Sequence, residues 1–147
     1  MSESTKTLDY WIEAAKKIAV FAHTGQFRND KRTPYIKHPE EVANAVEKRL
    51  QPIAWLHDTI EDSKGKVTLD TLKEAGFPQY IIDAVDVLTH VATDTNVVYW
   101  NKILKNEDAV IVKIADIKAN LGGNPSQYAR DKYARALKLF ADAGYSV

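Results

Sequence analysis

The sequence predicts an all-α fold with about eight helices, some of them short. Apolar residues recur at helical spacing in several segments. Residues that favour helix starts and glycines that favour helix ends separate these segments. Only residues 109–115 have the β-branched composition of a buried strand, and no second convincing strand is present to pair with them.

The first half of the chain contains three predicted helices and one long loop. Residues 7–22 place an apolar stripe at helical spacing, which predicts the first helix. Residues 23–37 are polar and include a Thr-Pro step, so they predict a surface loop of the kind that often carries function. Prolines then suit the first turns of two further helices, over residues 39 to about 50 and 52 to about 63.

Three shorter helices are expected next. A threonine caps a helix over residues 68–76, which a glycine ends. A proline opens a helix over residues 78–88, whose isoleucine, valine and leucine side chains share one face. Thr95 or Asn96 caps a helix that runs to Lys105.

The last third of the chain predicts two helices. The segment AVIVKIA at residues 109–115 is ambiguous between a buried strand and a buried helix, and we interpret it as a helix because it lacks a partner strand. Gly122 and Gly123 end it. Asn124 as cap and Pro125 in the first turn predict a final helix to about Ala143.

Composition excludes several classes of function. The 147 residues suit one domain spanning residues 1–147, and 20 Lys+Arg balance 20 Asp+Glu, so no net charge favours nucleic acid or a membrane surface. The absence of cysteine excludes disulfides and thiolate metal sites. No secretory signal or membrane-spanning apolar stretch is evident, so a cytoplasmic protein is expected.

Histidine and carboxylates gather in the segment AWLHDTIED at residues 54–62. His57 and Asp58 are adjacent, and Glu61 and Asp62 follow one helical turn later. Neighbouring carboxylates repel one another unless a cation lies among them. A His-Asp pair alone is weak evidence, because most such pairs are only solvated. The cluster becomes a candidate metal or acid/base site only with further ligands.

His38, in TPYIKHP, and Asp116, in VKIADIKAN, are those further ligands. Together with His57 and Asp58 they form a nitrogen and oxygen set without sulfur, which suits Mn, Fe, Co or Mg with water in the open positions. Asp116 interrupts an apolar run, where an unpartnered charge is costly. An ion pair with a nearby lysine or arginine remains the alternative reading of Asp116.

Basic residues lie close in sequence to the candidate ligands and predict a phosphorylated ligand. They occur in the loop, beside His38 and on either side of Asp116. They are Arg28, Lys31, Arg32, Lys37, Lys113 and Lys118. Asn120, one turn after Asp116, can donate or accept a hydrogen bond on the same face.

Three blocks of sequence resemble the hydrolase domain of RelA/SpoT-type alarmone enzymes, and in form the stand-alone small alarmone hydrolases. They are AHTGQFRNDKRTPYIKHPEEVA, AWLHDTIEDS and VKIADIKANL, which occur in the family's order over roughly residues 10–140. The resemblance implies a helical HD-domain bundle that holds one Mn²⁺ ion. It also implies hydrolysis of the 3′-pyrophosphate of the stringent-response alarmones ppGpp or pppGpp, which gives GDP or GTP and pyrophosphate.

The resemblance also assigns roles to residues of this chain. The implied metal ligands are His38, His57, Asp58 and Asp116. The Glu61-Asp62 pair matches the family's ED motif, which is associated with the attacking water. The substrate-binding residues that the resemblance implies are Arg28, Tyr99 and Asn120. The basic residues near the candidate ligands add Lys31, Arg32 and Lys113 as further substrate-binding candidates. His23 matches a position that holds loop structure.

The resemblance has departures, and alternatives stay open. The loop RNDKRTPY and the segment HVATDTN differ from the usual family pattern, so the exact nucleotide is less fixed than the chemistry. No synthetase domain follows, so hydrolysis alone is expected. The site could instead serve an adenosine alarmone, NADPH or a deoxynucleotide, or the chain could be an inactive nucleotide-binding module. The partner expected in each case is a phosphorylated nucleotide, and the sequence does not fix the oligomeric state.

Overall fold

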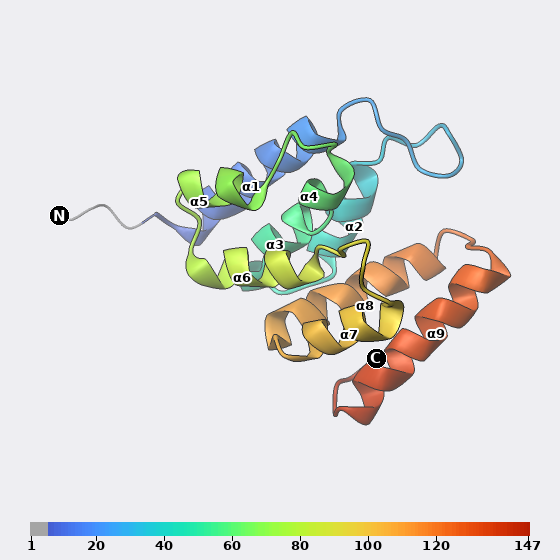
Figure 1. Cartoon of the computed structure of the whole chain (residues 1–147). Helices are drawn as coiled ribbons and strands as arrows, with labels where there is room; N and C mark the ends of the chain where they lie inside the picture. Colours follow the sequence, from blue (N-terminus) through green and yellow to red (C-terminus); the bar gives the residue numbers. More distant parts are fainter. Residues whose placement is uncertain (1–5) are drawn as a thin grey trace.

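The fold is entirely helical in the described part of the chain. The structure is a computed structural model that describes residues 6–147. The first five residues of the predicted domain, and of the segment considered for a secretory signal, lie outside it. The described residues form nine α-helices and one 3-10 helix (Figure 1). Among the described residues, the β-structure consists of one isolated antiparallel β-bridge between Phe27 and Pro34. The all-α prediction is confirmed, and the ambiguous segment 109–115 is helical.

The elements follow one another with short connections, apart from the loop after the first helix. In chain order they are α1 (Leu8–His23), α2 (Lys37–Asn44), η1 (Lys48–Leu50), α3 (Gln51–Leu56), α4 (Thr59–Asp62), α5 (Leu69–Glu74), α6 (Gln79–Leu88), α7 (Asn96–Leu104), α8 (Glu107–Leu121) and α9 (Gln127–Asp142).

The predicted helix starts are mostly confirmed. Thr68 and Thr95 cap α5 and α7, each accepting a hydrogen bond from the backbone N–H three residues on. The predicted start of the last helix is wrong. Asn124 has a φ of 60°, in the left-handed region that asparagine tolerates, so it belongs to the turn after α8. Ser126 caps α9 instead, because its Oγ accepts from Ala129 N–H at 3.2 Å.

Two predicted helices are shorter than expected, and one of these differences shapes the site. The helix predicted to Leu50 ends at Asn44 and is followed by η1. The helix predicted over residues 52–63 breaks into α3 and α4 at His57 and Asp58. The Thr59 hydroxyl donates to the carbonyl of Leu56 at 2.8 Å and stabilises the break. The two adjacent candidate ligands therefore lie in a turn.

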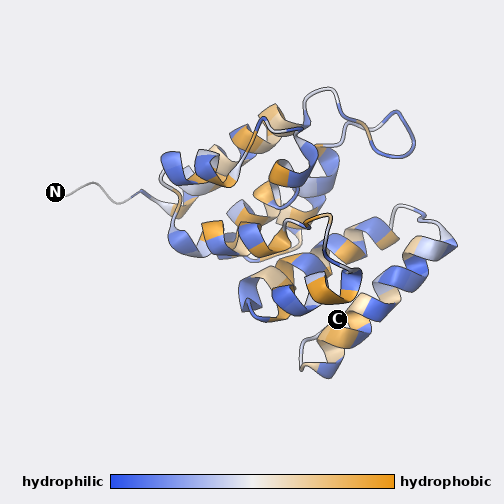
Figure 2. Cartoon of the chain, viewed as in Figure 1, coloured by the Kyte–Doolittle hydropathy of each residue, from blue (hydrophilic) through white to orange (hydrophobic). Residues whose placement is uncertain are grey.

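The core surrounds α3. The five residues from Pro52 to Leu56 are buried, and α3 packs against α1, α2, α6 and α8. On its other side α8 packs against α7 and α9 (Figure 1). Hydropathy follows this arrangement, since the long loop after α1 is mainly hydrophilic and apolar stretches lie where helices meet (Figure 2). This packing brings α2, the α3–α4 turn and α8 together.

The length and hydropathy of each helix can be compared with what a membrane-spanning helix requires. Among residues 6–147, each helix is too short or too polar to cross a bilayer.

Candidate metal centre

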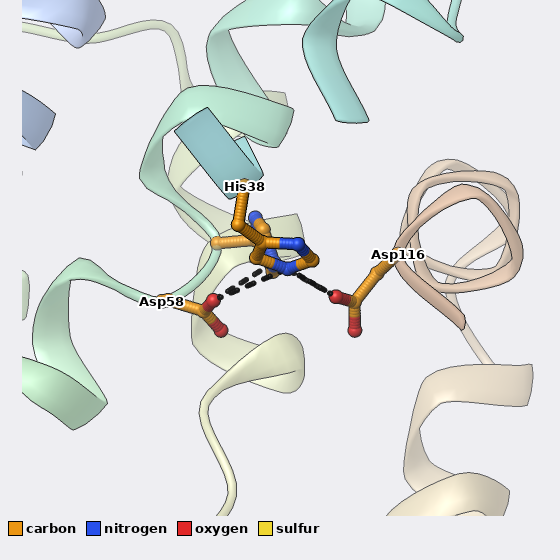
Figure 3. Close-up of side chains that lie close together, drawn as sticks. His38, Asp58 and Asp116 are labelled. Atoms are coloured by element: carbon orange, nitrogen blue, oxygen red, sulfur yellow. Dashed lines mark hydrogen bonds and ion pairs between the residues drawn. The ribbon is translucent and has the colours of Figure 1, made fainter. Parts of the chain in front are cut away.

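Four side chains from three parts of the chain converge between α2 and α8. His38 comes from α2, His57 and Asp58 come from the α3–α4 turn, and Asp116 comes from α8. One ligand atom of each lies within 4.8 Å of the others. His38, Asp58 and Asp116 point toward one another from separate elements (Figure 3). The structure thus brings together the four predicted metal ligands.

Both histidines direct Nε2 at carboxylate oxygens. His38 Nε2 lies 2.7 Å from Asp116 Oδ1 and 3.7 Å from Asp58 Oδ2. His57 Nε2 lies 3.1 Å from Asp58 Oδ2 and 3.3 Å from Asp116 Oδ1. Two nitrogens and two oxygens therefore face a common point, with the imidazoles and Asp116 buried.

The hydrogen bonding of His57 fits a cation at this point. Its Nδ1 lies 2.6 Å from the carbonyl oxygen of Ala54, which can only accept, so Nδ1 carries a proton. In the neutral ring Nε2 then presents a lone pair to two carboxylates. That arrangement is repulsive unless Nε2 is protonated or a cation lies between them. A divalent ion at this point would offset both carboxylates and accept both Nε2 lone pairs, and a carbonyl behind an imidazole is the usual supporting contact of a metal ligand.

The acid–base properties of the cluster reflect the same geometry. Burial opposes the charged form of His57, but the carboxylates of Asp58 and Asp116 outweigh it and raise the His57 pKa well above its usual range. Burial likewise opposes ionisation of Asp116, but Lys113 and the two histidines hold its pKa well below its usual range. Asp58 has a pKa of about 2, because His57 outweighs its burial. Both carboxylates are therefore ionised, as the binding of a cation requires.

Three neighbouring side chains orient these carboxylates. The Tyr35 hydroxyl donates to Asp58 Oδ2 at 2.6 Å. Lys113 Nζ donates to Asp116 Oδ2 at 3.0 Å, and Asn120 Nδ2 donates to Asp116 Oδ1 at 3.3 Å. Asp116 thus lies where a metal ligand was predicted, and it also forms the ion pair with a nearby lysine that was the alternative explanation for its burial. Sequence reasoning missed Tyr35, although its position three residues before His38 was the available signal.

Removing the Tyr35 hydroxyl is expected to weaken metal binding. Tyr35→Phe leaves Asp58 without its 2.6 Å donor, and loss of such a supporting contact lowers metal affinity by about tenfold or more. Titration of Mn²⁺ against a chelator of known affinity measures the change. Tyr128→Phe is the control, because Tyr128 is 64% exposed on α9. Equal Mn²⁺ affinities of the two variants would contradict the supporting role.

The Glu61-Asp62 pair lies in α4, beyond the turn that carries His57 and Asp58. Glu61 Oε1 accepts the backbone N–H of His90 at 3.0 Å. Burial, followed by the negative charges of Asp58 and Glu61, raises the pKa of Asp62 to about 6. Gln26 Nε2, from the long loop, donates to the backbone oxygen of Asp62 at 2.7 Å and fixes the end of α4. Sequence reasoning missed Gln26, because a contact across 36 residues leaves no local signal.

A cavity of about 430 Å³ reaches the cluster through His38. Residues of the long loop, the end of α8 and α9 line it, among them Arg28, Asn120 and Tyr133. Arg28 pairs with Glu41 of α2 at 2.5 Å. A Cβ at Gly123 would lie 3.3 Å from the Arg28 guanidinium, so glycine leaves room for this side chain. The volume lies within the range of small-molecule sites.

A second cavity, of about 130 Å³, reaches the cluster through Asp58. Its other lining residues include Glu61, Tyr99, Lys113 and, on α9, Lys132. Tyr133 lines both cavities. The candidate metal centre is therefore approached from two cavities of different size.

The predicted substrate-binding residues do not all lie in one place. Arg28 and Asn120 line the larger cavity, whereas Tyr99 and Lys113 line the smaller one. Tyr99 is buried, and its hydroxyl donates to the backbone oxygen of Leu88.

Lys31 and Arg32 line neither cavity. Both are exposed at the tip of the long loop. Asp30 shapes this tip by accepting from the backbone N–H of Arg32 and Thr33, each at 2.8 Å. His23, expected to hold loop structure, is buried with Nδ1 2.9 Å from Gln26 Oε1, at the start of the same loop.

Comparison with known proteins adds evidence on the fold. No protein-family model and no curated protein sequence matches the chain. A solved structure of a metazoan ortholog of SpoT, described as hydrolysing ppGpp and as playing a role in starvation responses, is similar to it. The two share 20% sequence identity with a TM-score of 0.71, and the similarity covers 93% of this chain and 85% of the other.

The similarity extends over nearly the whole chain, so it concerns the arrangement of the helices as a set. At 20% identity, this structural similarity is evidence for the fold alone. It agrees with the resemblance expected from the three sequence blocks. The chain has an all-α fold in which the helices are arranged as in this SpoT ortholog.

Proposed function

We propose that this protein is a Mn²⁺-dependent phosphohydrolase that removes the 3′-pyrophosphate of ppGpp or pppGpp, giving GDP or GTP and pyrophosphate. The observation that carries the proposal is the convergence of His38, His57, Asp58 and Asp116 beside a cavity of about 430 Å³. The similarity in fold to a protein described as hydrolysing ppGpp supports the choice of substrate.

The four convergent side chains would hold the divalent ion. When bound, such an ion supplies Lewis-acid polarisation of a phosphoryl oxygen and lowers the pKa of water. Tyr35 and Lys113 orient Asp58 and Asp116 for this task. Asp62, with its pKa raised to about 6, accepts a proton from water more readily than an ordinary carboxylate, and Glu61 lies beside it.

The two cavities receive the parts of the substrate. Arg28 and Asn120, in the larger cavity, offer a guanidinium and an amide to the nucleoside and its 5′-phosphates. Lys113, in the smaller cavity, places a positive charge beside the 3′-pyrophosphoryl group as charge develops on it. The reacting phosphorus would then lie at the four ligands, between the cavities.

Product analysis tests the proposed reaction. Purified protein with Mn²⁺ is expected to convert ppGpp into equal amounts of GDP and pyrophosphate, measured by ion-exchange chromatography. A panel containing the adenosine counterpart, NADPH and a deoxynucleoside triphosphate compares the alternative substrates. His57→Ala is the control for contaminating activity, because it removes one of the four ligands. If the native protein and His57→Ala release equal traces of pyrophosphate, the proposed function is wrong.

A further inference from the structure

Lys132 is a cation of the smaller cavity to which neither the sequence motifs nor the proposed function gives a role. It lies on α9, is half-buried and lines the cavity with Asp58, Glu61 and Lys113. Lys113 is already paired with Asp116 at 3.0 Å. Within residues 6–147, Lys132 makes no ion pair, and its Nζ lies 5.0 Å from the ring centre of Tyr133. Its charge is therefore available to a ligand.

The size of this cavity limits what the ligand can be. Its volume of about 130 Å³ is below the roughly 300–1,000 Å³ of sites that enclose a whole small-molecule ligand. That space suits a phosphoryl group and is too small for a nucleoside. The larger cavity, of about 430 Å³, has the volume for the nucleoside.

Both cavities border the four convergent side chains, and they share one lining residue. His38 lines the larger cavity, Asp58 lines the smaller one, and these two ligand residues approach each other to 3.7 Å. Tyr133 borders both cavities, and Lys132 lies over its ring. A substrate whose reacting phosphorus lies at the four convergent side chains therefore has room for one further phosphate in the smaller cavity.

We propose that the smaller cavity is a subsite for the terminal phosphate of the 3′-pyrophosphoryl group, and that Lys132 binds that phosphate. This inference rests on the proposed function. In the reaction, the oxygen of water bonds to the phosphorus attached to the ribose 3′ oxygen. The bond from that phosphorus to the 3′ oxygen breaks, and the 3′ oxygen takes the electron pair and a proton. The bond between the two phosphates stays intact, so pyrophosphate leaves as a unit.

The charges of the cavity agree with this role. Glu61 is one of two carboxylates that line the smaller cavity and would repel an anion, and its Oε1 accepts a hydrogen bond from the His90 N–H. The second carboxylate, Asp58, faces the histidines and the Tyr35 hydroxyl. Lys132 is therefore the group that distinguishes a 3′-diphosphate from a 3′-monophosphate, because only the diphosphate extends beyond the reacting phosphorus.

Binding of inorganic pyrophosphate tests the subsite directly. Equilibrium dialysis of labelled pyrophosphate against Mn²⁺-loaded protein, at fixed free Mn²⁺, is expected to show about a tenfold higher Kd for Lys132→Gln. The Kd for GDP is expected to stay within about twofold, because GDP occupies the larger cavity. Lys138→Gln is the control, because Lys138 is an exposed lysine on the same helix that pairs with Asp142. This variant is expected to leave the Kd values for pyrophosphate and GDP unchanged. Lys132→Arg keeps the charge and is expected to restore pyrophosphate binding.

The outcomes separate this inference from the proposed function. If Lys132→Gln binds pyrophosphate as well as Lys138→Gln does, or loses GDP and pyrophosphate binding equally, the subsite is refuted. Absence of pyrophosphate binding to the native protein also refutes it. Failure of the native protein to hydrolyse ppGpp, together with a selective loss of pyrophosphate binding in Lys132→Gln, overturns the proposed reaction but supports an anion subsite.

Discussion

Asp116→Asn is expected to reduce hydrolysis by on the order of 10³-fold or more and to abolish measurable Mn²⁺ binding. Asp116 is buried at 4% exposure and accepts contacts from His38, His57 and Lys113. Asparagine has nearly the same shape but removes the negative charge that all three partners face. Pyrophosphate release from ppGpp measures the activity, and isothermal titration measures metal binding.

The same substitution is expected to lower the free energy of unfolding of the metal-free protein by about 3 kcal/mol, because it leaves buried positive groups without a counter-charge. Metal added at about 100 times its Kd stabilises the native protein by about 2.7 kcal/mol, and Asp116→Asn loses this gain. Asp108→Asn is the matched control on α8, since Asp108 pairs with the more exposed Arg49. Its expected cost is below about 1 kcal/mol. Normal metal binding by Asp116→Asn would exclude Asp116 as a ligand.

Asp62→Asn is expected to reduce kcat by about 10²-fold while leaving Mn²⁺ affinity within about threefold of the native value. Asp62 lies one helical turn from Asp58, and its backbone N–H donates to the Asp58 carbonyl at 3.0 Å. Its half-buried position raises the carboxyl pKa to about 6, so it is a better proton acceptor than an exposed aspartate. It lies outside the four-residue ligand cluster. The expected loss therefore concerns proton transfer rather than metal binding.

Steady-state kinetics and metal titration on the same preparation separate these effects. Glu61→Gln, the adjacent change, shows which carboxylate of the pair carries the larger share of kcat. Asp70→Asn is the control, because Asp70 is an exposed residue in the first turn of α5. If Asp62→Asn lost metal affinity and kcat in parallel, Asp62 would belong to the metal centre, and its assigned role in proton transfer would be wrong.

Helix positions were predictable from local pattern, and failures occurred where tertiary contacts overrode it. Thr68 and Thr95 cap helices as predicted, because a cap depends on residues three apart. Asn124 was predicted as a cap, but its left-handed φ places it in the turn that redirects the chain from α8 to α9. The break at His57 and Asp58 was not predicted, because the sequence through residues 52–63 has a continuous helical pattern.

The sequence by itself determined the helical fold class and named the four convergent side chains. Helical periodicity and capping are local, and the spacing of the HD, ED and later Asp blocks is visible along the chain. Only the tertiary structure decided that Tyr35 supports Asp58 and that Lys31 and Arg32 stay at the loop tip. It also decided that Tyr133 and Lys132 border a second cavity. These facts depend on how α8 and α9 pack beside α3 and the loop, and contacts between residues so far apart leave no periodic signal in the sequence.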